Sequence, residues 1–398
     1  MNILVLNCGS SSIKYQLIDT VQSLLLAKGS VERIGMSGSV LTHKPHDRPE
    51  VKLAGEILDH IAGVEYVLSI LLSKNHGVIR DRSEIKAVGH RVVHGGEAFS
   101  GSVLLDNDSV AEIRRCIDFA PLHNPHNLRG IDACKRLLPG VPMVAVFDTA
   151  FHQKMPDYAF MYGLPMVLYK QYAIRRYGFH GTSHFFLARE AAAMLDKPLE
   201  ELKLITCHLG NGCSIAAVDG GVSVDTSMGF TPLEGLLMGT RSGDLDPAVV
   251  LHIMGRQELT IHETTTMLNK HAGLLGVSGV SSDMRDLEEA VAEGNTQAAL
   301  ARKMFCYRIK KYIGSYIAVL GGVDAIIFSG GIGEHDPDAR EVTMENMDYL
   351  GCVLDREKNA AKSRDAREIS AEGSRAKILV IPTNEELVIA QETQKLVS

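Results

Sequence analysis

The sequence has few cysteines and no dense run of basic residues, and each shortage excludes a class of protein. The chain of 398 residues holds seven cysteines and no Cys-x-x-Cys pair. An odd number of scattered cysteines favours reduced thiols over a disulfide framework or a zinc cage. The net charge is −7, without a Lys/Arg block, which argues against nucleic acid as a partner.

Long apolar runs and targeting signals are also missing. No segment approaches the ~18 apolar residues of a membrane-spanning helix, and the best candidate, residues 316–328, contains Asp324. The N-terminus enters an apolar strand without the basic region of a signal peptide. We therefore expect a soluble, cytoplasmic protein that does not bind a membrane.

The common nucleotide and hydrolase motifs are absent as well. The chain has no P-loop, no protein-kinase catalytic loop and no Gly-x-Gly-x-x-Gly fingerprint. The segment 94–96 has the form of an esterase oxyanion loop, but no Gly-x-Ser-x-Gly supplies a nucleophile, and the pair at 262–263 lacks the second histidine of a zinc protease.

Two similar segments are present near the start and the middle of the chain. Residues 3–15 and 204–216 each run from an apolar strand into glycine, serine or asparagine, and then into a second strand. Such turns can close on a bound anion, because glycine permits positive φ angles and serine or asparagine donates hydrogen bonds locally. The pair predicts two facing sites that hold one polyphosphate.

Strand-like segments alternate with helical ones, which predicts an α/β fold of layered sheets and helices. Asn124 is a candidate cap for the first expected helix, with Pro125 at its first position. We place one domain at residues 1–150 plus 386–398 and a second at 151–385. The expected strands are 2–7, 13–19, 85–93, 143–147, 204–208, 214–218, 324–329 and 377–381, and the expected helices are 125–138, 283–293, 296–320 and 385–397.

Three charged residues of the first half could act on a phosphate or carboxylate. Lys14 follows the first turn, although a solvated lysine is the ordinary alternative. Arg91 ends an apolar strand, and arginine binds such anions through two parallel N–H bonds, unless it forms a structural ion pair. Asp148 ends another strand, where carboxylates often hold a metal; a helix cap is an equally good explanation.

Small residues surround two further candidates in the second half. His180 and Arg241 could donate to the equatorial oxygens of a transferred phosphoryl group. A core or surface histidine, and a loop tied by Asp244, are the alternatives. Residues 326–334 form a strand that opens onto a glycine-rich turn, where bare backbone would let a base or ribose lie close.

Together these segments resemble the acetate kinase family, in the acetate-and-sugar-kinase/heat-shock-70/actin superfamily. The resemblance covers essentially the whole chain and is specific. It implies two domains of duplicated ββαβαα topology, actin-like and ribonuclease H-like, with a nucleotide cleft between them. It also implies reversible transfer of the ATP γ-phosphate to acetate, giving acetyl phosphate and ADP, and a homodimer. The matching segments are 6–14, 90–97, 145–151, 178–184, 208–212, 238–246, 330–334 and 383–386.

The resemblance also implies roles for individual residues. Asn7 and Glu385 would help to hold Mg²⁺, with Mn²⁺ as the alternative ion. Asp148, His180, Arg241 and Arg91 would be catalytic. Arg91 and Arg241 would flank the acyl carboxylate, and the methyl pocket would consist of Val93, Leu122, Phe179 and Pro232. The nucleotide would contact Lys14, His208, Leu209, Gly210, Asn211, Gly212, Asp283, Met284, Arg285, Gly331, Ile332, Gly333, Glu334 and His335.

Two residues depart from the family pattern. Met284 stands where an aromatic residue is frequent, and His335 where asparagine is common, so both bear on the preference for the nucleoside base. Because a small carboxylic acid with a pKa of about 4 is already ionised at neutral pH, Asp148 is better suited to orienting Mg²⁺ or substrate than to removing a proton.

Two other functions compete with this interpretation. One is a propionate or butyrate kinase on the same scaffold, since one methylene is worth only about 1–3 kcal/mol in an apolar pocket. The other is an actin- or chaperone-like ATPase switch, for which no peptide-binding or polymer-forming segment stands out.

Overall fold

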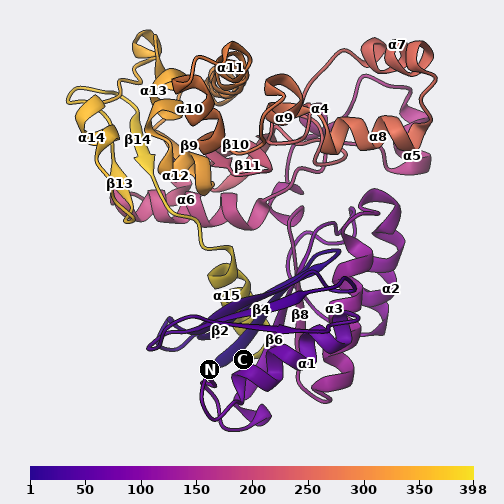
Figure 1. Cartoon of the computed structure of the whole chain (residues 1–398). Helices are drawn as coiled ribbons and strands as arrows, with labels where there is room; N and C mark the ends of the chain where they lie inside the picture. The colour runs from indigo at the N-terminus through magenta and orange to yellow at the C-terminus, as the bar shows by residue number, and fades with distance from the viewer. The chain divides into compact units, whose positions relative to one another are not determined.

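The computed structural model describes residues 1–398 and divides into two compact units (Figure 1). The first unit consists of Met1–Phe151 and Asn384–Ser398, and the second of His152–Thr383. Phe151, Asn384 and Glu385, which the sequence assigned to the second domain, therefore belong to the first unit.

The first unit is built on an eight-stranded mixed sheet with the order β5-β4-β3-β2-β1-β6-β8-β7. β1 pairs antiparallel with β2 and parallel with β6, and β6 pairs parallel with β8. The ends of β1, β6 and β8 therefore meet at one edge. The strands are β1 (Asn2–Cys8), β2 (Ser12–Asp19), β3 (Leu24–Glu32), β4 (Ser39–Pro45), β5 (Val51–Gly55), β6 (Ile85–Val92), β7 (Val103–Leu104) and β8 (Met143–Phe147).

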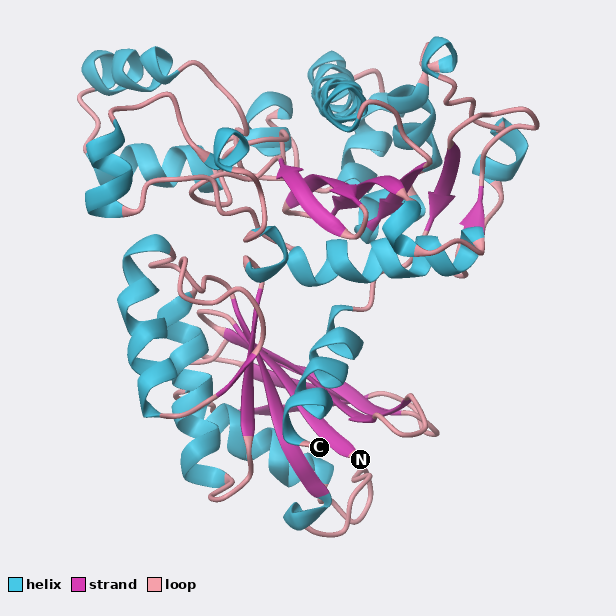
Figure 2. Ribbon diagram, turned by 180° about the vertical axis from the view of Figure 1, so that it is seen from behind, coloured by secondary structure: helices cyan, strands magenta, loops and turns pink.

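Helices cover both faces of this sheet, because alternate side chains of β1 point to opposite sides. Leu4 and Leu6 pack in the core that includes α1 and α3, whereas Ile3 and Val5 pack against Ile389 of α15. Figure 2 shows α15 on one face and the other helices on the opposite face. The helices are α1 (His60–Leu71), α2 (Asn107–Arg115), α3 (Asn124–Leu137) and α15 (Glu385–Val397).

The second unit repeats this architecture. Its sheet has the order β11-β10-β9-β12-β14-β13, and the first five strands correspond to β3-β2-β1-β6-β8 in both order and direction. Five antiparallel strands, β1 to β5, precede the first crossover of the first unit, and three, β9 to β11, precede that of the second unit. The strands are β9 (Lys203–Leu209), β10 (Cys213–Asp219), β11 (Val222–Thr226), β12 (Ala325–Ser329), β13 (Arg367–Glu368) and β14 (Lys377–Val380).

The helices of the second unit fall into two groups. The long helix α11 packs on the sheet through residues such as Phe305, Ile309 and Tyr316. α5 and α7 instead contain no buried residue and lie near α8, away from the sheet (Figure 1). No helix of the chain has the length and hydropathy required to cross a membrane. The helices are α4 (Asp157–Phe160), α5 (Met166–Tyr172), α6 (Gly181–Leu195), α7 (Pro247–Gln257), α8 (Ile261–Lys270), α9 (Gly273–Ser278), α10 (Met284–Ala292), α11 (Thr296–Leu320), α12 (Gly330–His335), α13 (Pro337–Met344) and α14 (Arg356–Ala360).

The structure corrects three local expectations. α3 begins at Asn124 itself, so the capping position belongs to His123. The glycine-rich segment after β12 is the short helix α12 and not an open turn. β3, β4 and β5 were not expected, because their half-exposed residues lack the apolar runs of the central strands.

Candidate active site

The two hairpin turns are similar, and each is closed by a hydrogen bond from a glycine amide to a carbonyl within the turn. In the first, Asn7 pairs with Lys14 across β1 and β2, and the Gly9 amide donates to the Ser12 carbonyl at 2.8 Å. In the second, the Gly210 amide donates to the Gly212 carbonyl at 3.2 Å. None of these three glycines has a positive φ angle, so the expected reason for glycine at the turns is wrong.

Space explains the glycine at the second turn instead. A Cβ atom on Gly212 would lie 3.3 Å from Nη1 of Arg241 and 3.5 Å from Cε1 of His180. A Cβ atom would therefore crowd the Arg241 guanidinium, whereas it would make only ordinary contact with His180. This close approach also means that the turn, Arg241 and His180 meet at one point of the second unit.

In the first unit, Arg91 and Asp148 form a bidentate ion pair. Nε and Nη2 of Arg91 donate to the two carboxylate oxygens at 2.9 and 2.6 Å. Parallel pairing of β6 with β8 creates this contact, because Asp148 follows β8 and its amide donates to the Val92 carbonyl at 3.0 Å. Asp148 is 1% exposed, whereas the Arg91 side chain is 21% exposed. Arg91 thus keeps an accessible edge for a second anion.

More charges surround this pair. Burial lowers the pKa of Arg91, but the charges of Asp148, Glu385 and Glu386 outweigh burial and raise it. Burial also raises the pKa of Glu385, which interacts with Arg91, Asp148 and Lys14. The first unit therefore brings Lys14, Arg91, Asp148 and Glu385 together.

Two asparagines hold this edge in place; the sequence analysis named Asn124 only as a candidate helix cap and did not name Asn127. Oδ1 of Asn127 accepts from the Val93 amide at 3.1 Å, and its Nδ2 donates to the Cys8 carbonyl at 2.9 Å. Asn124 bonds to both the amide and the carbonyl of His94. Both side chains are buried. The signal available in the sequence was the spacing of the two asparagines, three residues apart, in the first turn of an amphipathic helix.

Arg241 of the second unit has no carboxylate partner. Its Nη1 donates to the Pro232 carbonyl at 3.0 Å and contacts Sδ of Met238 at 3.5 Å. Burial lowers the pKa of this guanidinium. A partly buried cation that bonds only to neutral acceptors favours an incoming anion, since the anion would compensate its charge.

His180 is held beside Arg241 by a hydrogen-bond network, and its backbone lies in the left-handed region. It has a φ of 56° at the start of α6, an uncommon conformation for a residue with a side chain. Its Nδ1 lies 2.9 Å from Oγ of Ser214, which also contacts Nε2 of His184 at 2.7 Å. The His180 and His208 rings lie 4.4 Å apart, and Nδ1 of His208 contacts Oγ of Ser183 at 2.8 Å. These serines were not predicted.

A pocket of about 680 Å³ in the second unit collects most of the predicted nucleoside residues. Asp283 caps α10 and forms an ion pair with Arg285 at 2.6 Å, which lowers the pKa of Asp283 to about 2. Arg302 supports the pocket by donating to the Met284 carbonyl at 2.9 Å. The lining residues are Gly210, Asn211, Ser282, Asp283, Met284, Arg285, Glu288, Gly331, Ile332, His335, Asp336, Pro337 and Asp338.

Some predicted nucleotide residues do not line this pocket. Gly333 is buried, and Oε1 of Glu334 accepts from the amides of Gly330 and Thr383 at 3.0 and 3.3 Å. Glu334 therefore holds the end of β12. The structure places His208 and Leu209 at the end of β9, beside the turn.

The predicted methyl-pocket residues are divided between the units. Val93 is 6% exposed and Leu122 is 54% exposed, both in the first unit. Phe179 is 2% exposed in the second unit, where Pro232 lies against Arg241.

The expected metal ligands agree with the needs of Mg²⁺. No group of three or more His, Cys, Asp or Glu side chains forms a cage. Mg²⁺ does not require one, because it usually binds one or two carboxylates together with waters and substrate phosphates. Oε1 of Glu385 is buried and has no hydrogen-bond partner, close to Asp148, which leaves an oxygen atom for a cation.

The duplicated fold and these charged sites define a kinase of the actin-like ATPase fold. Comparison with known proteins identifies the particular family. A profile described as the acetokinase family matches residues 2–391, and the chain belongs to this family.

Three relatives illustrate the similarity. An acetate kinase of Caldanaerobacter subterraneus subsp. tengcongensis is 55% identical over 100% of this chain and 99% of its own. The crystal structure of Porphyromonas gingivalis acetate kinase is 44% identical, with a TM-score of 0.96 and 100% coverage of both chains. A propionate kinase from Francisella tularensis is 43% identical, with a TM-score of 0.93 and 99% coverage of both.

Proposed function

We propose that this protein catalyses the reversible transfer of the ATP γ-phosphoryl group to acetate, giving acetyl phosphate and ADP. Family membership and the acetate kinases among its relatives support this reaction. The observation that carries the proposal is Arg241, a partly buried guanidinium that bonds only to neutral acceptors beside a phosphate-type turn. Such a cation can compensate the negative charges that meet when a phosphoryl group passes from one anion to another.

The difficulty of this reaction is electrostatic repulsion, since acetate attacks phosphorus as an anion. No base is needed, because the acid is ionised at neutral pH. Arg91 and Arg241 flank the carboxylate, Lys14 meets nucleotide phosphate, and His180 donates to the transferring group. Fixed donors of this kind stabilise the charge that spreads over the equatorial oxygens. An acetate oxygen forms the new P–O bond as the bond to ADP breaks, by direct in-line transfer.

Asp148 acts in this scheme by positioning Arg91. Its carboxylate is buried and already accepts two hydrogen bonds, so removing protons is a poor role for it. The pair holds one edge of the guanidinium and leaves the other for substrate.

Asn7 and Glu385 would hold Mg²⁺, or Mn²⁺ as the alternative, at the first turn. The unpaired buried oxygen of Glu385 supports this assignment. When bound, the metal supplies charge compensation to the phosphates.

The pocket that contains Asp283, Met284, Arg285, Gly331, Ile332 and His335 would take the nucleoside of ATP or ADP. Its volume of about 680 Å³ fits a ligand of that size. His335, with a side chain that is 65% exposed, and Met284 would decide the preference for the base.

The test is ATP consumption in the presence of acetate, propionate, butyrate or no acid. We expect turnover that depends on acetate and on a divalent metal, with inversion at phosphorus. Hydrolysis independent of acid would indicate an ATPase switch, and stereochemical retention would indicate a phosphoenzyme.

Propionate is the second candidate acceptor, and similarity to a propionate kinase supports it. A methylene changes binding by only about 1–3 kcal/mol, so both acids should react. The ratio of kcat/KM for acetate to that for propionate decides between them, and Val93→Ala should shift this ratio toward propionate by enlarging the pocket.

We also propose that the protein is a cytoplasmic homodimer. The seven cysteines are all free and buried, which suits a reducing compartment. The helices α5, α7 and α8 carry exposed apolar side chains, including Val167, Leu251 and Ile261. Exposed apolar residues concentrated on a few elements are typical of a subunit interface.

A further inference from the structure

A cavity of about 800 Å³ in the second unit is lined mainly by basic charges. It lies between the α12–α13 region and the segment 359–367. Its wall holds four strongly basic side chains but only one carboxylate, Glu334, which is already bonded to backbone amides. The basic residues are Arg340, Lys362, Arg364 and Arg367.

Arg340 lines this cavity and forms no ion pair, although the charge of Asp336 acts on it. It is 2% exposed, and its Nε donates to Oδ1 of Asn359 at 2.7 Å. Its Nη1 donates to the Gly333 carbonyl at 2.8 Å and its Nη2 to the Asn359 carbonyl at 3.0 Å. All three acceptors are neutral. Burial, and then the nearby charge of Arg367, lower the pKa of Arg340 to about 10.

Arg367 adds a donor that the protein leaves unused. Its Nε is buried and has no hydrogen-bond partner, and its only hydrogen bond runs from Nη1 to the Ser363 carbonyl at 3.3 Å. Lys362 and Arg364, which are exposed at the rim, form no hydrogen bond or ion pair. Glu334 is the one acidic charge that acts on Arg367. Four basic side chains around a buried, unsatisfied donor therefore favour the binding of a further anion.

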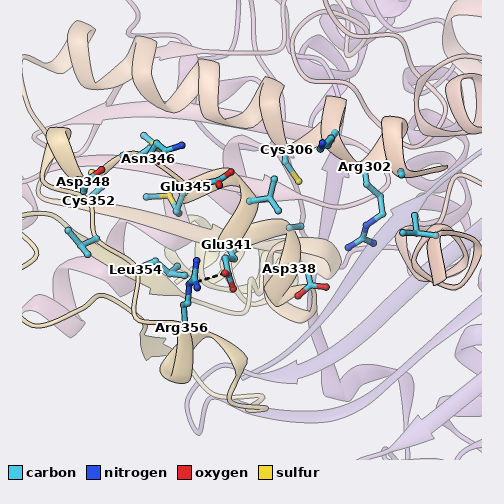
Figure 3. Close-up of a pocket in the computed structure, with 18 residues that line it drawn as sticks. Arg302, Cys306, Asp338, Glu341, Glu345, Asn346, Asp348, Cys352, Leu354 and Arg356 are labelled. Carbon is cyan, nitrogen blue, oxygen red and sulfur yellow. Dashed lines mark ion pairs between the residues drawn. The ribbon is translucent and has the colours of Figure 1, made fainter. Parts of the chain in front are cut away.

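A neighbouring pocket of about 670 Å³ provides a contrast (Figure 3). There Arg356 pairs with Glu341 at 3.0 Å, as the dashed line shows. Acidic residues such as Asp338 and Glu345 also line that pocket, so its charges are mixed. Because Arg356 is already paired with a carboxylate, the neighbouring pocket shows no sign of an anion site. The basic cavity differs in that its arginines have no such partner.

We infer that the cavity around Arg340, Arg364 and Arg367 binds a small phosphorylated molecule or inorganic phosphate, separately from the catalytic centre. Arginine forks match phosphate oxygens in a bidentate manner, and the volume suits a small metabolite. His335 and Pro337 line both this cavity and the nucleoside pocket, and Arg340 holds the carbonyl of Gly333 in α12. Occupancy therefore changes the affinity for nucleotide.

The test uses inorganic phosphate and pyrophosphate as probes of the full-length protein saturated with ADP, followed by ³¹P NMR and calorimetry. Arg364→Gln and the double variant Arg364→Gln/Arg367→Gln remove charge from the cavity. Arg356→Gln is the matched control from the neighbouring pocket, and thermal unfolding checks that each variant folds.

We expect the double variant to weaken binding at least tenfold, Arg356→Gln to leave it unchanged, and Arg364→Gln to keep wild-type turnover without added anion. Phosphate at the catalytic centre would behave in the opposite way: its binding would survive the double substitution and disappear in Arg241→Leu. That result, or equal weakening by Arg356→Gln, would overturn the inference without affecting the proposed reaction.

Discussion

At the scale of single residues, the two candidate substrate arginines differ in how their charges are balanced. Arg91 is held by a buried carboxylate, whereas Arg241 bonds only to a carbonyl and a thioether. A cation that lacks a partner in the folded protein adds little to stability and can give its full charge to a substrate. The two residues should therefore respond differently to substitution.

We predict that Arg241→Leu nearly abolishes turnover, with kcat reduced at least 10²–10³-fold. The melting temperature should change by no more than a few degrees, because leucine removes a desolvated charge without leaving a carboxylate unpaired. Steady-state kinetics and thermal unfolding measure the two effects. Wild-type kcat would refute the assignment, and Arg241→Lys provides the conservative control.

A second prediction concerns how the stability of the protein depends on pH through the buried His90. Burial lowers the pKa of His90 to about 3, whereas the unfolded value is 6.5. Between these values the unfolded chain binds a proton that the folded chain does not. The contribution of His90 to the free energy of unfolding is therefore fully present above pH 6.5. It decreases by about 1.4 kcal/mol per pH unit as the pH falls from 6.5 toward 3.

His90→Leu should remove this contribution. The variant should lose less unfolding free energy than the wild type between pH 7 and pH 5, measured by denaturant titration. Parallel pH curves for the two proteins would contradict the prediction. His262→Leu, at an exposed position, is the control substitution.

At the scale of elements, glycines near the second turn serve two separate purposes. Gly212 leaves room for Arg241 and His180. Gly330 has a φ of +75°, and a Cβ atom there would lie 2.7 Å from the Leu209 carbonyl oxygen, so it allows α12 to start against β9. Gly212 thus serves the active site, whereas Gly330 serves the folding of the chain.

We predict opposite outcomes for alanine at these two positions. Gly212→Ala should lower kcat/KM at least tenfold while the melting temperature stays nearly constant, because only the guanidinium must move. Gly330→Ala should cost about 1–3 kcal/mol of stability through backbone strain. Kinetics and thermal unfolding of both variants separate the effects, and a reversed pattern would show that these roles are misassigned.

At the scale of the whole molecule, the unburied helices of the second unit require an explanation. α5 and α7 have no buried residue, although both carry large apolar side chains. A second copy of the chain is the partner that we propose for them.

We predict that Leu251→Glu together with Ile261→Glu converts the dimer to a monomer, because two charges would enter an apolar interface. Light scattering coupled to size-exclusion chromatography gives the mass directly. Leu58→Glu, at a residue of the first unit that is 79% exposed, is the control and should remain dimeric. If the wild-type protein were monomeric at all concentrations, the proposed homodimer would be wrong.

Much of the fold could be predicted from the sequence, since strand and helix periodicity is a local property. The helices 296–320 and 385–397 have the predicted bounds, and each predicted strand occurs at its place. The half-exposed strands β3 to β5 were missed because their pattern is weak. Asn127 and Ser214 were missed because each supports a residue remote in sequence.

The sequence by itself determined the order of strands and turns and which residue types end the strands, because both are set by neighbours along the chain. Only the tertiary structure decided that Arg91 is paired and Arg241 is not, and that four cations share a cavity near α12. The reason is physical: charge balance depends on which strand ends and loops the fold brings side by side.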